Sequence, residues 1–149
     1  MSYNNCEHGL CGSHLTRELT HIVESNEYSW AAGMKELLLA TCKKVLSRKR
    51  KKLGSKEYLD LQKQYKSILK AGNKELPPIP ANPTGKRGKL AKSDAHNLWE
   101  RLKKYESSVL LFAKKAEVSF TNNRAIRYET LLCFRLLQHK HIVVNCRTW

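Results

Sequence analysis

Apolar residues recur at every third or fourth position over much of the first half of the chain, a spacing that places them on one face of an α-helix. In the first such stretch the recurring apolar residues are Leu15, Leu19, Ile22 and Val23. Ser13 precedes them and is a candidate N-cap, because its hydroxyl can accept a hydrogen bond from an N–H group of the first turn. The pattern predicts a helix from Ser13 to about Asn26.

Two more helices are predicted downstream, the second from Tyr28 to Leu53 with Gly54 as its stop, and the third from Ser55 to Gly72. The stripe of the second helix contains Trp30, Met34, Leu37, Leu38, Thr41, Cys42 and Val45. The stripe of the third contains Tyr58, Leu61, Tyr65, Ile68 and Leu69. Since the connection between them is short, these two helices can pair as an antiparallel hairpin.

The pattern then breaks at ELPPIPANPTGKRGKLAKSD, which holds all four prolines and two of the seven glycines and is predicted to be a linker or ordered loop. A fourth helix is predicted from Ser93 or Asp94 to Lys114. Its apolar positions are Leu98, Trp99, Leu102, Tyr105, Val109, Leu110 and Phe112. Beyond it we expect a short extended edge at Val118 and Phe120, a fifth helix capped by Asn123, and a possible strand at Ile142–Val144.

The charge changes the picture from an ordinary helical domain to a basic one. The 149 residues suffice for one domain, but 28 Lys and Arg oppose only 13 Asp and Glu, which gives a net charge of +15 and a pI near 9.8. The positive electrostatic potential of such a protein attracts polyanions, and DNA is the expected partner. The candidate DNA-contact residues are Lys43, Lys44, Arg48, Lys49, Arg50, Lys51 and Lys52 of the first basic run and Lys86, Arg87 and Lys89 of the linker. The alternatives are a solvated basic helix end or a nuclear-targeting run.

Cys6, His8, Cys11 and His14 are weak zinc candidates, because zinc takes about four thiolate or imidazole ligands but this spacing is too tight for a finger. The other interpretation is a packed thiol with a hydrogen-bonded imidazole, and a Cys/His nucleophile lacks any specified third group. The five cysteines are an odd number and do not suggest a set of paired disulfide bonds, so we expect reduced thiols in a cytoplasmic protein. No apolar run is long enough to span a bilayer, so we expect no membrane contact.

Four blocks in order resemble the bacterial transposases of the insertion sequence 66 family: CEHGLCGSHLTRELTHIVE, WAAGMKELLL, KLAKSDAHNLWERLKKYESSVLLFA and VSFTNNRA. The resemblance covers about residues 4 to 125. It implies an RNase H-like core, as in retroviral integrases, in which two aspartates and one glutamate bind two Mg²⁺ ions for attack on DNA. It also implies that Cys11, His14, Arg17 and Glu18, with Asn122 and Asn123, are structural motif residues.

The same resemblance implies that the catalytic carboxylates are missing. Both family aspartates fall upstream of the first matching block, and Ile126 stands where the family has its glutamate. Isoleucine has no oxygen with which to bind Mg²⁺. Glu129 lies three residues further on without aspartate partners. We therefore expect a truncated transposase fragment that takes no cofactor and has no catalytic residue, with a frame disruption near Ile126 as a hypothesis for the dissimilar tail.

The predicted fold is mainly α: a helical insertion region plus the remnant of an RNase H-like transposase core whose central sheet is largely missing. The predicted parts are a core helix with Cys-x-x-His (1–27), a basic helical hairpin (28–76), a linker (77–93), core-side helices (94–135) and an atypical tail (136–149). Residual DNA binding, self-association through exposed apolar faces, or interference with a full-length transposase as a small regulator follow as expectations.

Overall fold

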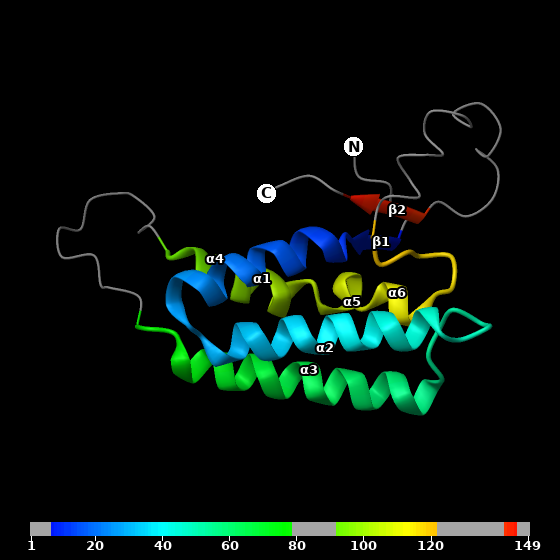
Figure 1. Cartoon of the computed structure of the whole chain (residues 1–149), viewed down its shortest axis with the longest axis horizontal. Helices are drawn as coiled ribbons and strands as arrows, with labels where there is room; N and C mark the ends of the chain where they lie inside the picture. Colours follow the sequence, from blue (N-terminus) through cyan, green and yellow to red (C-terminus); the bar gives the residue numbers. More distant parts are fainter. Residues whose placement is uncertain (1–6, 79–91, 122–141, 146–149) are drawn as a thin grey trace.

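The computed structural model describes residues 7–78, 92–121 and 142–145 of the chain. This part is mainly helical, with α1 (Gly12–Asn26), α2 (Ser29–Leu46), α3 (Ser55–Glu75), α4 (Asp94–Lys104), α5 (Glu106–Val109) and α6 (Leu111–Lys114). Two short strands, β1 (Glu7–Leu10) and β2 (Ile142–Asn145), pair in parallel with Glu7 opposite Ile142. In Figure 1, α1, α2 and α3 lie in successive layers, and the two strands lie beside the first turn of α1.

Helices α2 and α3 run antiparallel, as the sequence pattern predicted (Figure 1). Glutamates fix both ends of the pair. At the open end, the Glu75 carboxylate at the end of α3 accepts hydrogen bonds from the backbone N–H groups of Ser29 (2.9 Å) and Trp30 (3.3 Å), which start α2. At the turn, the Glu57 carboxylate accepts one from the N–H of Gly54 (3.1 Å). Both carboxylates satisfy N–H groups that helix geometry leaves without partners.

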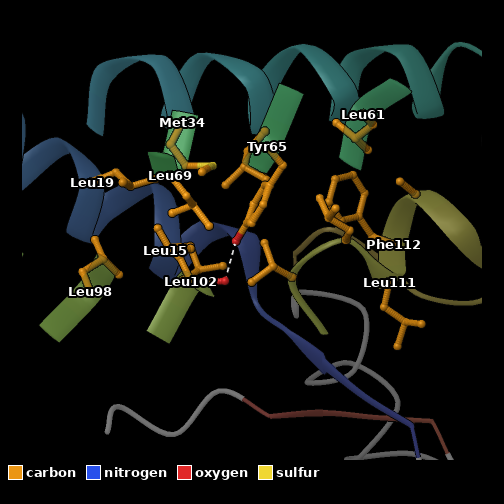
Figure 2. Close-up of a cluster of buried hydrophobic side chains, with 14 of the residues drawn as sticks. Leu15, Leu19, Met34, Leu61, Tyr65, Leu69, Leu98, Leu102, Leu111 and Phe112 are labelled. Carbon is orange, nitrogen blue, oxygen red and sulfur yellow. Dashed lines mark hydrogen bonds between the residues drawn. The ribbon is translucent and has the colours of Figure 1, made fainter. Parts of the chain in front are cut away.

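The core lies between the hairpin and the helices α1 and α4, and side chains from all four converge on it (Figure 2). Leu19, Met34 and Leu102 are fully buried there. Tyr65 is also fully buried, and its hydroxyl donates a hydrogen bond of 3.0 Å to the carbonyl oxygen of Leu102, drawn as a dashed line in Figure 2. Burial raises the pKa of the Tyr65 phenol, so this group stays a neutral donor.

Helix α1 begins one residue before the predicted start, with Cys11 rather than Ser13 as its N-cap. The backbone N–H of Gly12 donates to the carbonyl of Phe120 at 2.7 Å. A Cβ atom at Gly12 would lie 2.2 Å from the Phe120 ring, so only glycine allows this close approach. The partner that fixes the helix start is therefore a residue far along the chain rather than a local capping side chain.

The prediction that the second helix continues to Leu53 was wrong, because α2 ends at Leu46. Leu53 is buried, and its N–H donates to the carbonyl of Ala113 at 2.8 Å, which a continuing helix would not permit. Lys51 adopts a left-handed backbone (φ 49°) between the two helices. The seven cations of this run would also repel one another at helical spacing. Residues 47–54 are called the hairpin turn below.

Gly72 does not end α3, which continues to Glu75, so the prediction of a stop at this glycine was also wrong. Gly72 is buried against Trp30, and a Cβ atom at this position would lie 2.8 Å from Trp30 Cγ. The glycine allows α2 and α3 to approach each other closely at the indole ring. Its role is packing rather than termination.

The fourth predicted helix is divided into α4, α5 and α6, with breaks at Tyr105 and Leu110. The five consecutive residues from Val109 to Ala113 are all buried. A straight helix can point only one stripe of its surface at the core, so the chain must turn to bury them all. The start of this segment matches the prediction, since the Ser93 hydroxyl caps α4 by accepting from the N–H of His96.

The strand prediction at Ile142–Val144 is confirmed as β2, whereas β1 was not predicted. No strand forms at Val118 and Phe120 within the described residues; the Phe120 ring instead packs edge-on against Phe112, with ring centroids 4.8 Å apart. The fifth helix predicted from Asn123 lies outside the described residues, as do Asn122, Ile126 and Glu129.

Candidate nucleic-acid interface

The structure places the first basic run at the tip of the α2–α3 hairpin (Figure 1). Lys43 and Lys44 lie in the last turn of α2, and the remaining cations lie in the hairpin turn. Arg48 is half-buried, and the six lysines and arginines around it are exposed. Five of the seven cations therefore lie in a loop at one end of the molecule, whereas the sequence predicted all seven in the last turns of a helix.

Three of these seven cations have partners within the hairpin. Glu57 accepts contacts from Lys44 (3.1 Å) and Arg48 (2.5 Å). The Lys51 ammonium donates to the carbonyl of Leu46 at 2.8 Å and so satisfies the C-terminus of α2. The exposed cations without an ion pair or side-chain hydrogen bond to the described part of the chain are Lys43, Lys49, Arg50 and Lys52. These four are available to an anionic partner.

Glu57 organises the base of the hairpin turn. The hydrogen bond from the Gly54 N–H, followed by those from Arg48 and Lys44, lowers the pKa of the Glu57 carboxyl from its ordinary value of 4.5 to about 2. All three contacts favour the charged form of the carboxyl. A glutamate in the first turn of a predicted helix is a recognisable capping signal, and Glu57 has that place in α3.

Because the pKa of Glu57 is lowered in the folded state, its ionised form stabilises the fold above about pH 4.5, and this contribution disappears as the pH falls toward 2. We expect Glu57→Gln to be less stable than the wild type at neutral pH, with the difference vanishing between these two pH values. Urea unfolding midpoints at a series of pH values measure this. A difference between the two proteins that does not change with pH would contradict the role assigned to Glu57.

The other predicted site residues are placed only in part. Lys86, Arg87 and Lys89 lie outside the described residues, as does Cys6. His8 lies in β1, Cys11 is buried at the start of α1, and His14 lies in the first turn of that helix. Among the described residues, no group of three or more His, Cys, Asp or Glu side chains is arranged to hold a metal ion. The zinc hypothesis for the four Cys and His residues stays a prediction.

Three residues of the predicted structural motif, His14, Arg17 and Glu18, line a groove between α1 and α4. Glu18 forms an ion pair with Arg101 of α4, while Arg17 is exposed. His14 lines the same groove from one turn earlier. Arg101 and Lys104 also line this groove but were not predicted as site residues; their spacing, which places them on one face of α4, was the available signal.

The fold and this interface define a mainly helical, strongly basic protein with a charged hairpin at its tip. The family model described as Transposase IS66 family matches residues 1–130, and the chain therefore belongs to this family of transposases. The match confirms the predicted resemblance and reaches past Ala125. Searches of curated proteins and of solved structures find no match. Within the described residues, no helix has the length and apolar character needed to cross a membrane.

Proposed function

We propose that this chain serves transposition by holding the DNA backbone at the hairpin turn. The observation that carries the proposal is the group of four exposed cations, Lys43, Lys49, Arg50 and Lys52, for which the described residues provide no ion pair. Family membership supports a role in transposition, and every transposition reaction acts on DNA. Phosphate contacts of this kind give affinity and orientation but no sequence preference.

The hairpin turn is held to the rest of the protein in a way that suits such a contact. Leu53 is buried in the core, and its backbone bond to Ala113 fixes the end of the turn. The contacts of Glu57 with Gly54 and Arg48 fix its base. A loop that is already ordered loses little conformational freedom when it binds, so more of the electrostatic attraction remains as affinity.

Replacement of Lys49, Arg50 and Lys52 by Gln should weaken binding of duplex DNA and reduce its dependence on salt. Each phosphate neutralised contributes about 0.9 to the slope of log K against log salt, so the slope should fall in magnitude by roughly 3 if all three side chains contact phosphates. Fluorescence anisotropy with a labelled duplex at several salt concentrations measures both quantities.

The matched control replaces Lys63, Lys70 and Lys74, three exposed lysines of α3, by Gln and so removes the same charge away from the hairpin turn. This control should keep most of the salt slope. Equal losses in the two triple variants would mean that net charge alone drives the binding. Absence of a salt-sensitive complex with the unaltered protein at micromolar concentration would contradict DNA binding altogether.

We further propose that residues 1–149 do not catalyse strand transfer by themselves. The resemblance aligns Ile126 with the metal-binding glutamate of an RNase H-like core, and its side chain cannot coordinate Mg²⁺. Nicking of DNA by the pure chain should be absent with Mg²⁺. An Mg²⁺-dependent nick that Glu129→Gln abolishes would overturn this proposal, and interference with a full-length relative stays a prediction.

A further inference from the structure

A second groove, with a volume of about 420 Å³, lies between the later turns of α3 and the helix α4. Its wall combines one aromatic ring with three ammonium groups, those of Trp99, Lys66, Lys70 and Lys103. Lys66 comes about three helical turns after α3 starts at Ser55, so this groove is separate from the hairpin turn. It is called the Trp99 groove below.

The Trp99 ring is held in place and remains accessible from the groove. Its indole N–H donates a hydrogen bond of 2.9 Å to the carbonyl oxygen of Leu69, which fixes the ring against α3. Trp99 packs against the core but is only half-buried, and it lines the groove. An aromatic ring that is already ordered loses little conformational freedom when another flat ring stacks on it.

The charge around this ring is in excess positive. Glu106 is the one carboxylate among the lining residues, and it already accepts a hydrogen bond from the Gln62 amide (3.2 Å) and pairs with Lys66 at 3.7 Å. Lys70 and Lys103 are exposed, and the described residues provide no ion pair for either of them. Three cations therefore face one carboxylate, and the groove attracts anions.

We propose that the Trp99 groove binds a single DNA strand, with a base stacked on the Trp99 ring and the flanking phosphates held by the lysines. Proteins bind unpaired strands through this combination of an aromatic platform and a cationic groove. The Lys103 ammonium lies 5.0 Å from the centroid of the Trp99 ring. A cation over an accessible ring gains less than a stacked base does, so a base replaces the ammonium, which then meets a phosphate.

The site would distinguish an unpaired strand from a duplex, because the bases of a duplex are stacked on one another and cannot reach the ring. The inference rests on the proposed function in taking DNA as the partner. It does not depend on the hairpin turn, which is proposed to hold duplex DNA by its phosphates.

The first test follows the Trp99 signal by fluorine NMR in the full chain labelled with fluorotryptophan, with Trp99→Phe to assign the signal. The probe is a thymidine strand of about 15 nucleotides, and the control is an abasic strand of equal length, which keeps the phosphates but has no bases. We expect a saturable shift of the Trp99 signal with the thymidine strand only. No shift with the thymidine strand, or an equal shift with both strands, overturns the proposal.

Two variants test the parts of the site by fluorescence anisotropy. Trp99→Leu should weaken binding of the thymidine strand about fivefold or more and leave binding of the abasic strand unchanged. Lys70→Gln with Lys103→Gln leaves the ring in place, and the slope of log K against log salt for the thymidine strand should fall by roughly 1.4, at about 0.7 for each phosphate. The matched control, Lys49→Gln with Lys52→Gln in the hairpin turn, should keep this slope. Equal losses in the two lysine variants overturn the proposal.

Duplex DNA separates this site from the hairpin turn. If duplex binding does not depend on the hairpin turn while the thymidine strand still moves the Trp99 signal, only the proposal for the hairpin turn fails. If duplex binding depends on the hairpin turn while the thymidine strand leaves the Trp99 signal in place, only the proposal for the Trp99 groove fails.

Discussion

Trp30→Ala should cost about 3–5 kcal/mol of unfolding free energy, which is the range for removing a buried tryptophan from a packed core. Trp30 belongs to the first turn of α2, is 2% exposed, and packs its indole ring against Gly72 of α3. A domain of this size is stable by only about 5–15 kcal/mol, so the variant should be close to unfolding. Urea denaturation followed by circular dichroism measures the loss.

The contact between Trp30 and Gly72 gives this prediction a sharper form. In the wild type, Gly72→Ala should destabilise, because the added Cβ atom would lie 2.8 Å from Trp30 Cγ. In the Trp30→Ala background the same substitution should stabilise by about 1 kcal/mol, because alanine favours the helix and the obstructing ring is gone. The effect of Gly72→Ala would thus change sign between the two backgrounds. The same sign in both would contradict the close approach of α2 and α3 at this point.

Leu102→Ala should cost about 2–5 kcal/mol, because it leaves a cavity that the surrounding helices fill only in part. Leu102 is fully buried, and α1, α3 and α4 all contribute side chains around it (Figure 2). The control is Leu59→Ala on α3, which removes the same atoms from a side chain that is 56% exposed. The control should change stability by less than about 0.5 kcal/mol. Equal losses in both variants would contradict the burial of Leu102.

The charge pattern identified the candidate DNA-contact residues but not their arrangement. The run from Lys43 to Lys52 is evident from the sequence alone. Which of these cations find a partner among the described residues depends on Glu57, which pairs with Lys44 and Arg48, and on the carbonyl of Leu46, which accepts from Lys51. Those pairings depend on the turn geometry, which spacing along the chain does not define.

The sequence by itself determined which stretches form helices, where α3 and α4 start and where the short strand β2 lies, because these features depend on neighbouring residues. It also determined the family, because the matching blocks follow one another along the chain. Only the tertiary structure decided where α2 ends, why α3 passes through Gly72, and which polar faces meet in the α1–α4 groove. These features depend on contacts between distant residues, such as Leu53 with Ala113 and Glu18 with Arg101. Local propensities are weak beside such packing, so distant contacts override them.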